Sequence, residues 1–318
     1  MKYDYSTQEP LHLPKQNSWP ESFHVFEKDH HYALLAAEAA GRPLLLRGEP
    51  GTGKSQLARA AAVATQRLFL SVVVNARTEC EDLQWKFDAV ARLGEAQILA
   101  SVPDADRLAR LRPSRFLSPG PLWWALNWES AQRQFEDCIN PCDPIPEIPE
   151  GWKPSQGSVV LIDEIDKADT DLPNSLLETL GNGDFNVPYI GTSVRRETAV
   201  PAPLVIITTN EERELPAAFV RRCLVLPLNL PENQTDLIEF LGRRGAVHFG
   251  KCCSVGVLQQ AAEMLAEDRA AAEPGQPRPG QAEYLDLLRA ISGMAQDEAE
   301  QLELLSTLRR YLYRKATA

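Results

Sequence analysis

The chain has 318 residues, a formal charge of −11, 44% apolar and 24% charged residues, which fits a globular protein with one large and one smaller domain. No apolar run approaches the roughly 20 residues that a membrane-spanning helix needs, and the N-terminus lacks the pattern of a signal peptide, so we expect a cytoplasmic protein with no membrane span. Because acidic residues outnumber basic ones on both sides of residue 229, generic attraction to nucleic-acid phosphate is disfavoured.

The first half of the chain changes pattern twice. Residues 1–22 are polar and punctuated by prolines, which indicates an extended lead-in. Helical spacing predicts a helix over 27–40 that ends at Gly41. Residues 79–100 also have a helical pattern, whereas residues 101–156 contain many prolines and four tryptophans and break it.

Five short apolar segments predict the strands of a central sheet. None alternates apolar with polar residues, as expected of strands that are covered on both faces. Helical stretches between them imply right-handed crossovers and therefore a parallel sheet. The five segments are residues 43–48, 68–75, 158–163, 204–209 and 223–228.

After Pro231 the apolar residues recur at helical spacing throughout. We therefore divide the chain into a large α/β domain over residues 1–228 and a helical domain over 229–318. Helices are expected over 232–245, 257–272, 282–295 and 298–316, with the stretch 273–280 separating the second from the third.

Residues 48–55 match the pattern G-x-x-x-x-G-K-[ST] without a mismatch. Glycines let successive backbone N–H groups turn inward around an anion, and the helix expected over 54–66 adds the partial positive charge of its N-terminus. Lys54 can span the β- and γ-phosphates, while the Ser55 hydroxyl can ligate Mg2+. A strand before the loop and a helix after it disfavour a simple turn. We predict a nucleoside triphosphate site at Gly48, Glu49, Pro50, Gly51, Thr52, Gly53, Lys54, Ser55 and Gln56.

Acidic and amide side chains follow two of the predicted strands. Asp163 and Glu164 end an apolar strand that points toward the phosphates; Asp163 would hold Mg2+ through water, and Glu164 would orient the attacking water. Asn210 ends the next strand, with an amide that can position the water or touch the γ-phosphate. Asp166 and Asp169 fit a solvated helix start instead.

In chain order, the phosphate loop, the acid pair, Asn210, an arginine pair and a helical C-terminal domain resemble the AAA+ ATPases. The resemblance covers nearly the whole chain after residue 25 and implies the αβα sandwich of P-loop NTPases with a five-stranded parallel sheet and an all-helical lid. It also implies an enzyme, an ATPase that uses ATP and Mg2+; adenine specificity rests on this resemblance.

Within the AAA+ ATPases the chain resembles the MoxR-like branch most. Residues 78–97 followed by 119–127 are similar to the insert that those proteins carry within helix 2, and we assign residues 76–156 to this region. Residues 181–203 resemble their β-hairpin before the sensor 1 strand. MoxR-like proteins act as chaperones that remodel or activate a partner protein, often beside a von Willebrand factor A-type partner.

The resemblance implies a homo-oligomeric ring, usually a hexamer, in which an arginine from the neighbouring subunit completes each site. Arg222, immediately before the fifth strand, stands where related ATPases place this finger, and Arg221 is the alternative. Surface ion pairs remain the competing interpretation for both.

One departure concerns the lid, where the family usually has a sensor 2 arginine at the start of the third helix. Here residues 279–284 hold no arginine at that place, and Arg278 and Arg289 are the nearest candidates. This departure motivates a second hypothesis, a nucleotide-gated scaffold or sensor with slow turnover in a defence or signalling assembly. A GTPase is disfavoured because no N-K-x-D motif is present.

Other features fit structural roles first. Trp123 and Trp124 could contact a client, but such rings more often anchor a long insert to its own domain. Arg195 and Arg196, on the expected hairpin, could face a pore. A basic run that we interpret as a solvated helix face consists of Arg107, Arg110, Arg112 and Arg115.

The six cysteines show no metal-ligand pattern. Cys138 and Cys142 frame a short segment, but no second pair stands at the spacing of zinc ligands. We expect reduced thiols that mostly serve packing, at Cys80, Cys138, Cys142, Cys223, Cys252 and Cys253.

Overall fold

A computed structural model describes residues 5, 9–101, 104–273 and 278–313 of the chain. Parts of the predicted lead-in, half of the stretch that separates the second and third lid helices, and the end of the last predicted helix lie outside these residues. The chain forms two compact units. The sheet unit consists of Met1–Tyr5, Asp29–Leu46 and Ala58–Leu226, and the lid unit of Ser6–Lys28, Arg47–Leu57 and Pro227–Ala318.

The sheet unit is built on a five-stranded parallel sheet in the order β11-β3-β10-β7-β4. The predicted strands are confirmed as β3 (Leu44–Arg47), β4 (Leu68–Val73), β7 (Ser158–Asp163), β10 (Leu204–Thr209) and β11 (Leu224–Pro227). In β7 and β10 only Asp163 is more than slightly exposed, as strands covered on both faces require. Leu70 of β4 pairs with Val160 of β7, which in turn pairs with Val205 of β10.

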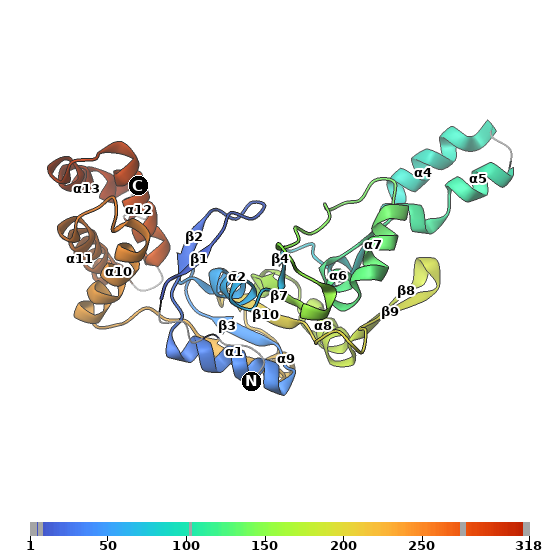
Figure 1. Ribbon diagram of the computed structural model, residues 1–318, viewed down its shortest axis with the longest axis horizontal. Helices are drawn as coiled ribbons and strands as arrows, with labels where there is room; N and C mark the ends of the chain where they lie inside the picture. Colours follow the sequence, from blue (N-terminus) through green and yellow to red (C-terminus); the bar gives the residue numbers. More distant parts are fainter. Residues whose placement is uncertain (1–4, 6–8, 102–103, 274–277, 314–318) are drawn as a thin grey trace. The chain divides into compact units, whose positions relative to one another are not determined.

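Helices flank this sheet, giving the predicted α/β class (Figure 1). The predicted helix 27–40 is confirmed as α1, and the one expected over 54–66 as α2. The helices that accompany the sheet include α1 (Lys28–Ala40), α2 (Lys54–Ala64), α6 (Pro121–Leu126), α7 (Trp128–Asp137), α8 (Asp171–Asn182) and α9 (Ala217–Val220).

The expectation of one helical stretch over 79–100 is wrong. It divides into α3 (Cys80–Gln84), the strand β5 (Trp85–Phe87) and α4 (Ala89–Ile98). The strand forms because it pairs antiparallel with β6 (Leu117–Pro119), about 30 residues on, with Trp85 opposite Pro119. Asp88 then starts a new helix by accepting a hydrogen bond from the N–H of Ala91 at 2.7 Å.

Within the region assigned to an insert, the β5–β6 ladder carries α4 and α5 (Asp104–Arg110), which extend away from the sheet strands (Figure 1). Arg110 of the predicted basic run pairs with Glu95 of α4 at 2.6 Å, and Arg112 with Asp137 at 3.6 Å. Two of the four arginines of the run therefore form ion pairs with this chain's own carboxylates.

The tryptophan pair belongs to the core of the sheet unit, as the anchoring interpretation predicts. Trp123 and Trp124 are 2% and 5% exposed. The Trp123 indole donates to Ser130 Oγ at 3.0 Å, and the Trp124 ring lies 4.7 Å from that of Trp128, which meets Trp152 at 5.0 Å. These rings fix α6 and α7 to the sheet.

The hairpin expected before the fourth strand is present, with β8 (Asp184–Val187) and β9 (Thr192–Arg195) antiparallel. Arg195 pairs with Asp184 at 3.5 Å, and Arg196 donates to the carbonyl of Val200 at 3.1 Å. Both arginines are thus engaged within their own hairpin region.

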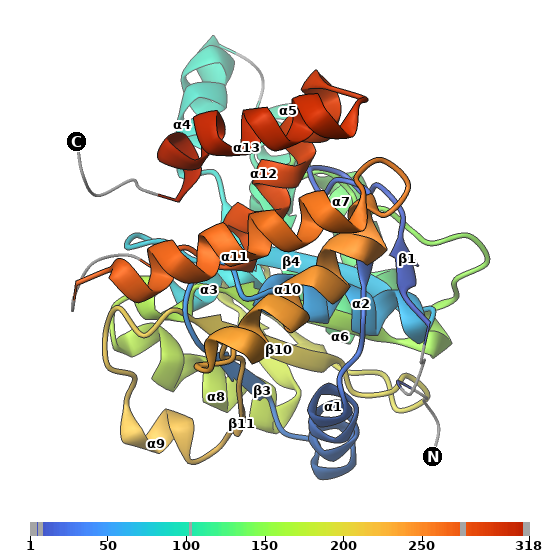
Figure 2. The same ribbon diagram turned by 90° about the vertical axis from the view of Figure 1, so that its left-hand side faces the viewer.

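The lid unit contains the four predicted helices, α10 (Gln234–Phe249), α11 (Val255–Ala271), α12 (Gln281–Met294) and α13 (Glu298–Leu312). Figure 2 shows α10 and α11 side by side. Asn233, Ser254 and Asp297 cap three of the helices through their side-chain oxygens. Apolar residues of all four helices, among them Leu241, form one core.

Part of the lead-in pairs as a hairpin, which the expectation of an extended segment did not include. Strands β1 (Leu11–Leu13) and β2 (Ser22–His24) are antiparallel. Arg244 of α10 holds the chain after β2 by donating to the carbonyl of Val25 at 3.0 Å and to Glu27 at 2.6 Å. Within the described ranges, none of the helices combines the length and the hydropathy that a transmembrane span requires.

Candidate functional site

The loop after β3 adopts a backbone that only glycine accepts easily. Gly48, Gly51 and Gly53 have φ angles of 146°, 79° and 92°. A Cβ on Gly48 would lie 2.3 Å from the carbonyl oxygen of Leu228, and one on Gly51 would lie 3.0 Å from the Cβ of Ala282. Gly48 is therefore required by the space available, and Gly51 and Gly53 are favoured by their positive φ angles.

Lys54, the first residue of α2, lies across this loop. Its ammonium donates to the carbonyls of Gly48 at 2.7 Å and Glu49 at 2.8 Å, and the residue is 6% exposed. The Thr52 hydroxyl also donates to the Glu49 carbonyl, at 3.0 Å. The lysine charge thus lies at the N-terminus of an 11-residue helix, where an anion is favoured. This combination of glycine backbone, lysine and helix start fits a nucleotide's phosphates.

The remaining loop residues follow the predicted order. Pro50 is exposed at the loop's turn, and Ser55 and Gln56 are half-buried in the first turn of α2. Ser55 thus offers a hydroxyl at the helix start, the donor type that suits a phosphate-bound Mg2+.

Lid residues hold this loop through contacts that the sequence did not indicate. Arg269, near the end of α11, pairs with Glu49 at 2.5 Å and donates to the Pro279 carbonyl at 3.1 Å. The N–H of Ala282, in the first turn of α12, donates to the carbonyl of Gly51 at 3.1 Å. The unit therefore includes a lid arginine at the phosphate loop, although not where the family pattern places one.

Within the described residues, neither of the two lid arginines expected as candidates has a hydrogen bond or ion pair with the loop. Arg289 pairs with Asp286 one turn away at 2.5 Å, and Arg278 is exposed. Beside Ala282 at the start of α12, the amide nitrogen of Gln281 lies 4.0 Å from the position that a Cβ on Gly53 would take. A neutral amide therefore stands where the resemblance implies a cation.

At the carboxyl end of β7, Asp163 and Glu164 are fixed by a hydroxyl of the neighbouring strand. Thr208 of β10 donates to Asp163 Oδ1 at 2.5 Å and accepts from the N–H of Glu164 at 2.9 Å. Glu164 has a left-handed φ of 60°, which is uncommon for this residue type and is held here by both contacts. No pattern in the sequence indicates this role of Thr208.

The Glu164 carboxylate has a partner on each oxygen. Asn210 donates from its side-chain amide to Oε1 at 3.2 Å, and Lys167 pairs with Oε2 at 2.7 Å. The hydrogen bond to Glu164 raises the pKa of Lys167. The structure thus brings together two predicted site residues, Glu164 and Asn210, and adds a lysine that sequence reasoning missed.

Asp166 is 2% exposed, so the prediction of a solvated helix start is wrong for this residue. Its carboxylate accepts from the N–H groups of Asn210 at 3.4 Å and Glu212 at 3.0 Å. It therefore fixes the backbone that carries Asn210. Asp169 is exposed, as expected.

Arg221 and Arg222 are both exposed after α9. Arg42 donates to both of their backbone carbonyls, at 3.0 Å to that of Arg222. Within the described part of the chain, no carboxylate pairs with either side chain, so the alternative of surface ion pairs has no support there.

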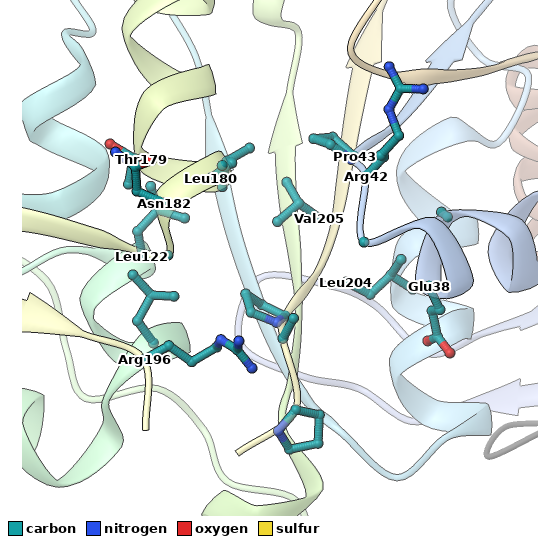
Figure 3. Close-up of a pocket in the computed structure, with 18 of the residues that line it drawn as sticks. Glu38, Arg42, Pro43, Leu122, Thr179, Leu180, Asn182, Arg196, Leu204 and Val205 are labelled. Atoms are coloured by element: carbon teal, nitrogen blue, oxygen red, sulfur yellow. The ribbon is translucent and has the colours of Figure 1, made fainter. Parts of the chain in front are cut away.

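The sheet unit also has a cavity of about 590 Å³ (Figure 3). Leu204 and Val205, at the amino end of β10, are among its largely apolar lining residues, together with Leu122 of α6. Glu38, on its wall, forms an ion pair with Arg67 at 2.8 Å and accepts a hydrogen bond from the Tyr5 hydroxyl at 2.6 Å. The cavity contains none of the predicted site residues.

The cysteines have no disulfide partner. Burial raises the pKa of both Cys80 and Cys223 to about 11, opposed in part by a hydrogen bond to Thr179 and by Arg42 respectively. Such thiols stay protonated and unreactive near neutral pH. No metal-binding cluster of His, Cys, Asp and Glu occurs among the described residues.

Comparison with known proteins adds a family and three similar structures. Two are RuvB of Thermotoga maritima: a point mutant (17% identity, 89% of this chain and 69% of that chain, TM-score 0.45) and the Holliday junction branch migration motor (17%, 89% and 68%, 0.41). The third is a putative ATPase from Cytophaga hutchinsonii (14%, 88% and 79%, 0.37).

No curated protein sequence matches the chain. The family model described as "AAA domain (dynein-related subfamily)" matches residues 43–223, more than half of the chain. This range begins just before β3 and ends just before β11. It contains both the phosphate loop and the acid cluster formed by Asp163 and Glu164. The chain therefore belongs to the AAA domain family, dynein-related subfamily.

Proposed function

We propose that the chain is a Mg2+-dependent ATPase of the MoxR-like branch, which acts as an oligomeric ring and remodels or activates a partner protein. The observation that carries the proposal is the pairing of Glu164 with Asn210 at 3.2 Å at the end of a sheet strand, in a chain whose glycine loop opens α2. Nucleotide binding alone needs only the loop; the acid and amide together suit hydrolysis.

Each residue has a role that its chemistry allows. The loop N–H groups and Lys54 bind the phosphates, and Glu164 orients the attacking water and takes its proton. Asn210 and Lys167 fix the two Glu164 oxygens, so that the carboxylate is preorganised. Ser55 and, through water, Asp163 would hold Mg2+, which neutralises charge on the phosphates when bound.

Arg222, with Arg221 as the alternative, acts in trans on the site of the neighbouring subunit. Its exposure, and a backbone anchored by Arg42, support this assignment, because a finger must be free to reach another chain while its base stays fixed. The proposed ring is a hexamer in the cytoplasm that acts on a protein client, with a von Willebrand factor A-type protein as its partner. Nucleic acid is not expected as a partner.

A nucleotide-gated scaffold with slow turnover is the second candidate. The observation that favours it is Gln281 at the start of α12, where the family places a cation. A neutral amide stabilises transition-state charge less than an arginine does, which would slow hydrolysis while leaving binding intact.

The experiment measures mass by light scattering and phosphate release for the wild type, Glu164→Gln and Asp169→Asn, with and without ATP and Mg2+. We expect ATP to drive assembly toward six subunits, and Glu164→Gln to assemble while losing about 100-fold in turnover. Asp169→Asn, an exposed acid nearby, should match the wild type. Assembly with equally slow turnover in all three proteins would favour the scaffold; unchanged turnover in Glu164→Gln beside a fast wild type would exclude the role of Glu164.

A further inference from the structure

The phosphate loop contains a carboxylate that opposes its own function. Residues 48–55 hold one basic residue, Lys54, and one acidic residue, Glu49, so their charges cancel. A nucleoside triphosphate is strongly anionic. A carboxylate in the loop that binds this ligand repels its phosphates. A further cation beside Glu49 offsets this repulsion and leaves Lys54, the backbone N–H groups and the helix start to attract the ligand.

Arg269 supplies that cation from the lid. Its guanidinium lies 2.5 Å from Glu49 Oε2, and its side chain is 14% exposed. The preceding residue, Asp268, is engaged elsewhere, because Arg309 pairs with it through two bonds at 2.5 and 2.9 Å. The two neighbouring charged residues of α11 therefore have different partners: Asp268 pairs with α13, and Arg269 pairs with the loop.

The same guanidinium joins the loop to the start of α12. Its Nη1 donates to the carbonyl of Pro279 at 3.1 Å, two residues after which α12 begins. Ala282, in the first turn of that helix, donates to the carbonyl of Gly51 at 3.1 Å. Arg269 is therefore bound to the loop and to the lid segment that contacts the loop.

We propose that Arg269 sets nucleotide affinity by neutralising Glu49, so that the loop has a net positive charge only when the lid holds it. This inference rests on the proposed function, because it takes the loop as the phosphate site. Arg269 is a positioning residue in this account: it acts on the nucleotide through Glu49. The lid is then coupled to nucleotide binding through the Glu49 carboxylate of the loop, instead of through a cation at the start of α12.

The test is a double-mutant cycle read out as the Kd for a fluorescent ATP analogue. Arg269→Ala leaves Glu49 unneutralised and should weaken binding about tenfold. Glu49→Gln removes the repelling carboxylate and should tighten binding, and Glu49→Gln with Arg269→Ala restores the wild-type net charge and should bind within about threefold of the wild type. Arg269→Lys keeps the charge and should recover most of the loss. Arg243→Ala, an exposed arginine of α10, is the matched control and should bind as the wild type does.

The cycle separates an electrostatic role from a structural one. If Arg269 merely supports the lid, Arg269→Ala and the double variant will lose affinity equally, and the inference is wrong. Unchanged binding by Arg269→Ala would also overturn it while leaving the proposed function intact. If the wild type itself fails to bind ATP, the proposed function fails and this inference fails with it.

Discussion

The acid cluster of the sheet unit and the phosphate loop of the lid unit are held in different ways. Asp163 and Glu164 are fixed by Thr208 and Asn210, which belong to the adjacent strand and its end. The loop is fixed by Arg269 and Ala282, some 220 residues further along the chain in the case of the Arg269–Glu49 bond. One site is a product of strand order, whereas the other depends on a helical region folding onto a loop.

This difference has a consequence for stability. Parallel strand pairing in a buried sheet opens only with global unfolding, whereas contacts from a small helical bundle can open locally. We therefore expect the acid cluster to be rigid, and the loop to respond to whatever moves the lid. Substitutions in each region, and a change of pH, test this contrast.

The largest effect is expected for Lys54→Ala. This change removes the only cation of the loop's own sequence, and ATP affinity should fall at least about 100-fold. Equilibrium binding of a fluorescent ATP analogue measures it. Lys251→Ala, an exposed lid lysine, should bind normally; retained micromolar affinity in Lys54→Ala would refute the phosphate-loop assignment.

Much of this contrast could be predicted from the sequence, and the reason lies in local patterns. The five strands were recognisable because each is a short apolar run without alternation, and parallel strands bring their carboxyl ends together. Asp163, Glu164 and Asn210 stand at those ends, so that their proximity follows from chain order alone.

The contacts that decide the geometry could not be predicted. Thr208 lies inside an apolar strand and looks like an ordinary β-branched residue. Lys167 follows a stretch of acidic and apolar residues, and its spacing from Glu164 does not by itself indicate a contact. Arg269 is one of several charges on α11, and no local pattern links it to Glu49. The strand β5 was missed for the same reason, because its partner β6 is separated from it by two helices.

A smaller effect is expected for Thr208→Val, which tests whether strand order alone positions the acids. Loss of the hydroxyl leaves Asp163 and the N–H of Glu164 without this partner, at a cost of about 1–3 kcal/mol in unfolding free energy. Turnover should fall about tenfold, since Glu164 is less well held. Thr208→Ser keeps the hydroxyl and should restore both; equal loss in the serine variant would point to packing.

The smallest effect is a pH dependence confined to the lid unit. Burial, assisted by Arg244 and Arg289, lowers the pKa of His248 from 6.5 to about 4. Between these two pH values His248 is protonated in the unfolded chain and neutral in the folded lid. The free energy of unfolding therefore falls as the pH drops from 6.5 toward 4. We expect a loss of roughly 1–2 kcal/mol between pH 7.5 and 5, discounted because the ring is partly exposed.

Urea unfolding followed by helical circular dichroism at the two pH values measures this loss. His248→Phe retains a ring against Phe23, which the histidine meets edge-on at 6.0 Å, and should reduce the pH-dependent loss. An identical loss in the variant would show that other groups titrate.

Mixing two inactive variants tests most directly the claim that the loop, the acid cluster and a trans arginine cooperate in ATP hydrolysis. Lys54→Ala should lack binding and Arg222→Ala should lack the finger, so each alone hydrolyses ATP slowly. In mixed rings an Arg222→Ala subunit supplies an intact loop and a Lys54→Ala neighbour supplies an intact finger. We expect the mixture to release phosphate several-fold faster than either variant alone. The gain should scale with the fraction of interfaces that join an intact loop to an intact finger. A mixture no faster than its components would contradict an arginine acting across a subunit interface.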